Sequence, residues 1–269
     1  MTTISVEKVS IAIREAVEAE LLPRFGQLQA HEIREKAPGD LVTVADEAME
    51  HHLRASLTRI LPGSITVGEE EVAENPTILE RLHSDSPVWI LDPIDGTANF
   101  SRGDRRIAVI IALVRNGETV AGWVHDPLTN ITAVTEKGAG TYIDGNRTVI
   151  TQPAPETSIF DFSGWLGAGG QDMERSERIR GIREQFRENI NLRCVGQMFL
   201  SLLRDEHQIA LYHRTKPWDF AAGVLMLLEA GGAVHRLDRS PYQPVANAGP
   251  LLIAPDQESW NQLRQLIDG

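Results

Sequence analysis

The stretch Trp89-Ile90-Leu91-Asp92-Pro93-Ile94-Asp95-Gly96-Thr97-Ala98-Asn99-Phe100 decides the fold of this chain. Residues 88–91 are an apolar run that predicts a buried strand, and the run ends at two aspartates around a Pro-Ile corner. A buried strand rarely ends in this way for packing reasons alone. Residues 92–97 are therefore the first candidate for a functional site.

The corner between Asp92 and Asp95 has the composition of a cation site. Proline cannot donate to a strand ladder, so the corner frees the Ile94 carbonyl and lets both carboxylates point to one side of the strand end. Gly96 and Thr97 follow, and a Gly-Thr pair that opens a helical turn offers N–H groups to an anion such as phosphate. Magnesium prefers carboxylates together with substrate oxygens, so the stretch predicts magnesium and a phosphate ester. Taken alone, the same pattern is also common turn chemistry.

Composition limits the possible partners. The 269 residues carry a formal net charge of −12, whereas phosphate backbones and anionic membranes bind to clustered basic residues. We therefore expect no nucleic-acid partner and no membrane. Cys194 is the single cysteine, which excludes an intramolecular disulfide and a thiolate zinc cluster. Because neither a signal peptide nor a run of 18 apolar residues is found, we expect a soluble cytoplasmic protein.

Apolar periodicity predicts the elements of the first half of the chain. A polar segment over residues 29–40 is interpreted as a loop, and Thr43 with Asp46 is a capping pattern for the helix that follows. Tight turns after the Asp92 corner predict mostly antiparallel strands. The expected helices are 4–25 and 43–60, and the expected strands are 64–68, 88–91, 106–115, 119–125, 131–136, 140–143 and 147–150.

Beyond the Pro153-Ala154-Pro155 segment, strands and helices alternate, which predicts an α/β half on a mixed or largely parallel sheet. The expected strands are 158–162, 190–194, 208–212, 232–237 and 251–254, the expected helices are 172–187, 196–204, 218–230 and 256–267, and residues 164–170 are interpreted as a glycine-rich loop. In this half, Asp219 lies in the first turn of an apolar helix, where it complements the helix dipole. The small residues 221–223 permit close approach to a neighbour, for which the Asp92 corner is a candidate.

Four blocks, taken together and in this order, resemble the inositol monophosphatase family of magnesium-dependent, lithium-sensitive sugar phosphatases. Each block alone is a weak signal, but four in the right order at sensible spacings are specific. The likeness covers roughly residues 4–267. The blocks are Asp40-Leu41-Val42-Thr43-x-x-Asp46, Gly68-Glu69-Glu70, residues 89–100 and Trp218-Asp219-x-Ala221-Ala222-Gly223.

This resemblance implies an α/β fold, with an α+β N-terminal half, built as a layered αβαβα sandwich. Its first sheet would be rich in antiparallel strands and its second sheet mixed. An N-terminal domain over residues 1–152 would supply most metal ligands, and a C-terminal domain over 153–269 would supply Asp219 and the substrate side. Members of the family are usually dimeric, so we expect a homodimer.

The resemblance also implies a role for individual residues. Two to three magnesium ions would be bound by Glu69, Asp92, the Ile94 carbonyl, Asp95 and Asp219. The catalytic residues would be Asp46 and Thr97, which orient the attacking water, and Glu69. Substrate contacts would come from Gly96, Thr97, Gly196, Gln197, His213 and Asp219. The implied activity is a magnesium-dependent phosphomonoesterase that hydrolyses a small polyol or sugar phosphate with metal-activated water.

The substrate side departs from the inositol-specific pattern. Inositol-specific members of the family carry Gly-Ser-Ala-Ala after a strand that ends in Arg, whereas this chain has larger residues in the matching stretch 193–199. The family also has a carboxylate shortly before the Trp-Asp block, where this chain has Tyr212-His213-Arg214. A nucleotide 3′-phosphate, fructose bisphosphate or histidinol phosphate is therefore an alternative substrate. A non-catalytic, metal-binding regulatory relative is a further alternative. Lys36 roughly matches a mobile loop of the family, but a solvated lysine is the expected interpretation.

Overall fold

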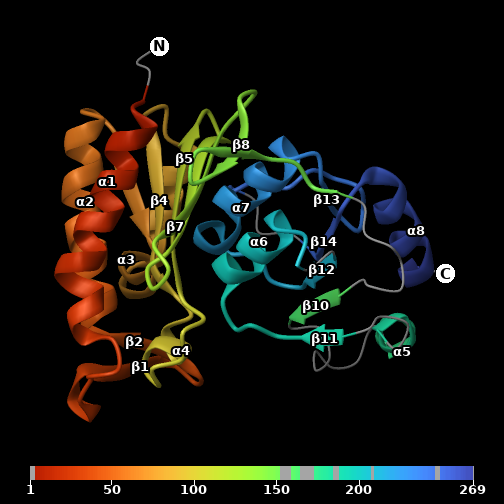
Figure 1. Cartoon of the computed structure of the whole chain (residues 1–269), viewed down its shortest axis with the longest axis horizontal. Helices are drawn as coiled ribbons and strands as arrows, with labels where there is room; N and C mark the ends of the chain where they lie inside the picture. Colours follow the sequence, from red (N-terminus) through yellow and green to blue (C-terminus); the bar gives the residue numbers. More distant parts are fainter. Residues whose placement is uncertain are drawn as a thin grey trace.

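The computed structural model describes residues 4–151, 159–163, 173–183, 188–206, 209–245 and 249–268. The described elements form five layers in the order helix, sheet, helix, sheet, helix, which Figure 1 shows from left to right. The predicted αβαβα sandwich is therefore confirmed. Among the described residues, no helix combines the length and the apolarity that a bilayer span needs.

The first sheet has seven strands in the order β3-β4-β5-β6-β7-β8-β9. Strands β3 and β4 are parallel, and each of the following pairs is antiparallel, as the tight turns predict. The strands are β3 (Ile65–Gly68), β4 (Val88–Asp95), β5 (Ala108–Arg115), β6 (Glu118–Asp126), β7 (Ile131–Glu136), β8 (Gly140–Ile143) and β9 (Asn146–Thr148).

Helices cover both faces of this sheet. On one face α1 (Val6–Ala16) and α2 (Val44–Ile60) pack against Trp89 and Leu91 of β4. The alternate residue Ile90 lies in the core on the other face. Because successive strand residues point to opposite faces, a strand buried on both reads as a continuous apolar run. The apolar run over residues 88–91 therefore predicted the buried strand β4.

The second sheet has the order β11-β10-β12-β14-β13 and is mixed, as predicted. Strands β11, β10 and β12 are parallel, whereas β14 is antiparallel to both of its neighbours. Helices α6 and α7 lie between the two sheets, and α5 and α8 lie on the outer side (Figure 1). The elements are β10 (Ile159–Ser163), α5 (Met173–Arg183), β11 (Glu188–Ile190), α6 (Val195–Leu203), β12 (Ile209–Tyr212), α7 (Pro217–Glu229), β13 (Ala233–Arg236), β14 (Leu251–Ala254) and α8 (Gln257–Asp268).

The core between the sheets joins residues from both halves of the chain. Ile90 and Ile110 of the first sheet belong to the same buried cluster as Ala210 and Ile253 of the second. The predicted boundary at residues 152–153 and the glycine-rich stretch 164–170 lie outside the described residues. The division into two domains therefore stays a prediction.

Two expectations about local structure were wrong. The polar segment 29–40 is not a loop throughout, because β1 (Ile33–Ala37) pairs with β2 (Asp40–Thr43) in an antiparallel hairpin. The sequence did not predict β1 because most of its residues are charged, so it lacks the alternation of apolar and polar residues that indicates a strand. The strand expected up to residue 194 is described only as Glu188–Ile190, and Arg193 has a positive φ of 53°, so the backbone turns before α6.

The remaining short elements connect these layers. They are the π-helical turn Val17–Leu21, the 3₁₀ turns Leu22–Arg24, Ala30–Glu32 and Pro76–His83, α3 (Glu69–Glu74) and α4 (Thr97–Phe100).

The close approach of α7 to the first sheet is testable at Gly122 in β6. A Cβ atom at this position would lie 2.9 Å from the Cα of Ala222, which is backbone and cannot turn aside. We expect Gly122→Ala to lower the free energy of unfolding by about 1–3 kcal/mol, as overpacked cores do. Urea denaturation measures the change.

The matched control is Gly181→Ala in α5, where a Cβ atom meets nothing within 4 Å. Alanine is the better helix former, so this variant should be neutral or stabilising by up to about 1 kcal/mol. Equal stability of Gly122→Ala and the wild type would contradict the described packing of α7.

Candidate active site

The site begins where β4 leaves its ladder with β5. Asp92 pairs with Ile110 and Asp95 pairs with Ala108, so β4 holds one extra residue at the Pro-Ile corner. Such a bulge ends regular pairing and re-aims side chains. The Ile94 carbonyl accepts a hydrogen bond from Thr97 Oγ1 at 3.0 Å. The corner therefore leaves the ladder as the proline predicts.

The turn after the corner requires a glycine. Gly96 has φ +86°, and a Cβ atom there would lie 2.9 Å from the Arg106 carbonyl oxygen. In the helical turn that follows, the buried Asn99 donates from Nδ2 to the carbonyl oxygens of Arg106 at 2.7 Å and Leu192 at 3.0 Å. These bonds join the corner to the segment that precedes α6 in the other half of the chain.

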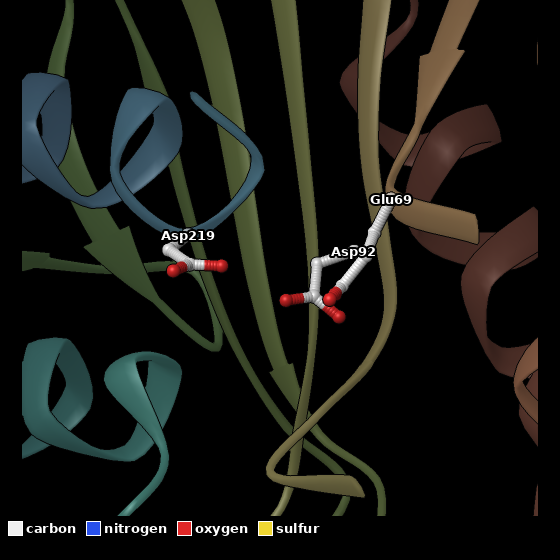
Figure 2. Close-up of side chains that lie close together, drawn as sticks. All are labelled: Glu69, Asp92 and Asp219. Atoms are coloured by element: carbon white, nitrogen blue, oxygen red, sulfur yellow. The ribbon is translucent and has the colours of Figure 1, made fainter. Parts of the chain in front are cut away.

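Three acids from different elements converge beside this corner. Glu69 is the first residue of α3, directly after β3; Asp92 lies in β4; and Asp219 lies in the first turn of α7. Each offers an oxygen atom within 4.8 Å of the other two, and Figure 2 shows the side chains in this arrangement. Strands β3 and β4 are parallel and adjacent, so their carboxyl ends deliver Glu69 and Asp92 to one edge of the sheet.

A cavity of about 180 Å³ lies at these acids. A larger hollow of about 490 Å³ lies between α1 and the β7–β8 hairpin, but none of the predicted site residues lines it. The acids, and not cavity size, therefore identify the candidate site. The smaller cavity is lined by Gly39, Asp40, Leu41, Glu69, Asp92, Ile94, Asp95, Gly96, Thr97, Ala98, Arg193, Lys216 and Asp219.

The electrostatics of the cluster fit a divalent cation. Burial, followed by the charges of Glu69 and Asp95, raises the pKa of Asp92 well above its usual range. The same causes raise the pKa of Asp219. Among the described groups, Asp92 Oδ1 is a buried oxygen with no hydrogen-bond partner. Buried acids of like charge with an unpartnered oxygen are suited to a hard cation that binds through oxygen.

Asp95 reaches the same cavity but lies outside the three-acid group. Its Oδ2 accepts hydrogen bonds from the Gly196 backbone N–H and from Cys194 Sγ, the latter at 3.1 Å. Burial raises the pKa of Asp95 to about 6, against the lowering effect of the Gly196 bond. The start of α6 therefore fixes one carboxylate oxygen of Asp95 at the edge of the cavity.

Asp46 and Thr97 form a pair next to the acids. Thr97 Oγ1 lies 3.0 Å from Asp46 Oδ1, and Asp46 Oδ2 accepts from the Thr43 backbone N–H at 2.8 Å and the Thr43 hydroxyl at 2.5 Å. The predicted capping pattern at the start of α2 is thus confirmed. Burial raises the pKa of Asp46 to about 6, against the hydrogen bonds from Thr43 and Thr97.

The expectation that Lys36 is a solvated lysine was wrong. Its side chain is 12% exposed, and its Nζ lies 3.1 Å from Glu69 Oε1 and 2.9 Å from Glu70 Oε1. Burial lowers the pKa of Lys36, but the charges of Glu69 and Glu70 outweigh this effect and raise it above its usual value. The β1–β2 hairpin turns the side chain inward, and a segment taken as a loop could not predict that direction.

The predicted substrate residues divide into two groups. Gly96, Thr97 and Asp219 line the cavity, whereas Gly196, Gln197 and His213 do not. Gln197 Nε2 donates to the Ile107 carbonyl oxygen at 2.8 Å. Gly39, Ala98 and Arg193, for which the sequence predicted no role, also line the cavity, as do Lys216 and the first two residues of the Asp40-Leu41-Val42-Thr43 block. The Asp40-Leu41-Val42-Thr43 block, which precedes Asp46 in the sequence, was the signal that could have placed the β1–β2 hairpin at the site.

Comparisons with known proteins show the family of this chain. The sequence profile described as the inositol monophosphatase family matches residues 4–267. Inositol-1-monophosphatase of Caulobacter vibrioides is 30% identical over 255 residues, covering 90% of this chain and 93% of that protein. Fructose-1,6-bisphosphatase/inositol-1-monophosphatase of Thermotoga maritima is 32% identical over 197 residues, covering 72% of this chain and 71% of that protein.

Solved structures share the fold. An IMPase structure from Thermotoga maritima superposes with a TM-score of 0.80 at 22% identity, covering 98% of this chain and 96% of that one. The suhB structure from Bartonella henselae also gives 0.80, at 21% identity and 97% coverage of both chains. With its profile matched over nearly the whole length and its acids at the expected elements, this chain belongs to the inositol monophosphatase family and is a phosphoric monoester hydrolase.

Proposed function

We propose that this protein is a magnesium-dependent phosphatase that hydrolyses a small polyol or sugar phosphate. The observation that carries the proposal is the convergence of Glu69, Asp92 and Asp219 at a cavity that Thr97 also lines. Family membership supports phosphate-ester chemistry, and the acidic cluster supports the metal.

Five groups at the cavity would hold two to three magnesium ions. They are the carboxylates of Glu69, Asp92, Asp95 and Asp219 and the carbonyl oxygen of Ile94, and all five residues line it. Bound magnesium supplies a water nucleophile at neutral pH and neutralises charge on the phosphoryl and leaving-group oxygens.

Thr97 and Asp46 would orient the attacking water. The Thr97 hydroxyl has a single proton, and both acceptors within reach, Asp46 Oδ1 and the Ile94 carbonyl, lie at 3.0 Å. Whichever oxygen accepts that hydrogen bond, the Thr97 oxygen keeps a lone pair that can accept a hydrogen bond from a water in the cavity. Asp46 is itself held by two bonds from Thr43, so the pair is fixed before substrate arrives.

The phosphate would lie against the backbone N–H groups of Gly96 and Thr97, at the turn that opens α4. Arg193 and Lys216 also line the cavity and bring positive charge to an acidic protein. Lys216 Nζ lies 3.6 Å from Glu69 Oε1. These two cations offset part of the negative charge of the acids that line the cavity, which are Asp40, Glu69, Asp92, Asp95 and Asp219.

The leaving group is the least determined part of the substrate. Arg193 and Lys216 suit a second anionic group, which favours a bisphosphate or a nucleotide as the alternative to a simple polyol phosphate, with histidinol phosphate as a further candidate. Two similar proteins support these alternatives. The Thermotoga maritima relative is named fructose-1,6-bisphosphatase/inositol-1-monophosphatase, and one solved structure of SaIMPase-II has 2′-AMP bound. We also propose a homodimer, from the family resemblance, and a cytoplasmic location. The two-domain division at residues 152–153, which rests on the Pro153-Ala154-Pro155 segment, is proposed as well.

Magnesium should stabilise the folded protein. At 100 times its dissociation constant, a ligand that binds the folded state alone adds about 2.7 kcal/mol to the free energy of unfolding. We expect Asp92→Asn to remove this gain while raising the melting temperature of the metal-free protein, because one buried like charge is lost. Thermal melts with and without magnesium measure both effects.

The exposed acid Glu80 provides the control, and Glu80→Gln should keep the full magnesium shift. A wild-type melting temperature that does not respond to magnesium would refute the metal site.

Phosphate release should depend on the acids of the cluster, among them Asp219. We expect the wild type with magnesium to release inorganic phosphate from at least one ester in a panel of inositol 1-phosphate, fructose 1,6-bisphosphate, 2′-AMP and histidinol phosphate. Asp219→Asn should lower turnover by at least about 100-fold, since loss of outer-shell partners alone costs about 10–100-fold. Asp238→Asn, an exposed acid of the same half of the chain, should act as wild type. Phosphate release from Asp219→Asn at the wild-type rate would remove Asp219 from the site.

A further inference from the structure

Glu50 is a buried acid directly behind the candidate metal ligands. It lies in α2, one turn after Asp46, and its side chain is 5% exposed. The buried face of α2 otherwise consists mainly of apolar residues, among them Met49, Leu53 and Leu57. A buried carboxylate on such a face costs free energy unless its oxygens are hydrogen-bonded.

Both oxygens of Glu50 are hydrogen-bonded to α3. Oε2 accepts from the backbone N–H of Glu70 at 2.9 Å, and Oε1 accepts from the backbone N–H of Glu71 at 3.1 Å. These are the two residues that follow the metal-ligand candidate Glu69. The N-cap residue of α3, Gly68, provides no side-chain cap. Glu50 thus supplies from a different helix the cap that α3 lacks in its own sequence.

Gly68 allows this contact. A Cβ atom at residue 68 would lie 2.2 Å from the Glu50 carboxyl carbon and within 2.5 Å of both of its oxygens. The carboxylate therefore packs directly against the backbone that carries Glu69. Any side chain at this glycine would displace it.

The charges around Glu50 are balanced on the side away from the cavity. Arg54 lies 3.9 Å from Glu50 Oε1 and 3.1 Å from Glu71 Oε1. Arg81 donates to Glu71 at 2.9 Å and to the Thr66 carbonyl oxygen of β3 at 2.9 Å. The network joins α2, α3 and β3, the three elements that position Asp46 and Glu69.

We propose that Glu50 is a positioning residue for Glu69 and hence for magnesium binding. Its carboxylate fixes the first turn of α3 against α2, and α2 also carries Asp46. The same helix therefore sets the separation between the metal ligand Glu69 and the water-orienting pair. The inference rests on the proposed magnesium-dependent function.

The test is Glu50→Gln with Glu47→Gln as the matched control. A glutamine at residue 50 has nearly the same shape, but its NH₂ group faces one of the two α3 N–H donors that the carboxylate accepts. We expect the magnesium concentration at half-maximal activity to rise by about 10–100-fold, with turnover at saturating magnesium reduced by less than about threefold. Glu47 is an acid of the same helix outside its buried face, so Glu47→Gln should keep the wild-type value.

Gly68→Ala gives a second variant, which keeps every charge and displaces the Glu50 carboxylate through its methyl group. It should raise the magnesium concentration at half-maximal activity in the same way. Calorimetric titration with magnesium, which needs no substrate, should show the same loss of magnesium affinity. Wild-type magnesium affinity in either folded variant would overturn the positioning role while leaving the proposed function intact. A wild type without magnesium dependence would refute the proposed function, and the role of Glu50 with it.

Discussion

Mutual repulsion among buried carboxylates is the constraint on which this structure depends. Two like unit charges about 4 Å apart repel by about 4 kcal/mol at an effective dielectric constant of 20. Three such pairs among Glu69, Asp92 and Asp219 would approach the total stability of a typical domain, about 5–15 kcal/mol. The cluster must therefore be neutralised by cations or protons. The raised pKa of Asp92 and Asp219 favours protonation of these acids, and Lys36 places a positive charge beside Glu69. Both features reduce the repulsion within the cluster.

The fold reduces this cost in two ways. Glu69 and Asp219 both lie in the first turn of a helix, where the dipole favours negative charge. The bulge in β4 then brings Asp92 beside them without breaking the apolar core, because the strand is regular up to the corner and buried on both faces. A rigid scaffold of two sheets with helices between them therefore holds groups that would otherwise move apart.

Local chemistry explains how much could be predicted from the sequence. The elements with strong periodicity and the acids at strand ends and helix starts were predicted, because their signals lie within a few residues of each other. The β1–β2 hairpin and the inward direction of Lys36 were missed, because β1 is short and mostly charged. Glu50 was also missed, although its helical spacing from Asp46, Met49 and Leu53 places it on the buried face of α2. The hydrogen bond from Gln197 to Ile107 joins residues 90 positions apart, and no local pattern predicts it.

A crystal structure of the protein grown with manganese tests the central claim most directly, because manganese takes the oxygen ligands of magnesium and scatters anomalously. The account predicts an anomalous peak at bonding distance from carboxylate oxygens of Glu69, Asp92 and Asp219 together. A map without a peak between these three acids, or with the side chains turned toward separate regions of solvent, would contradict it.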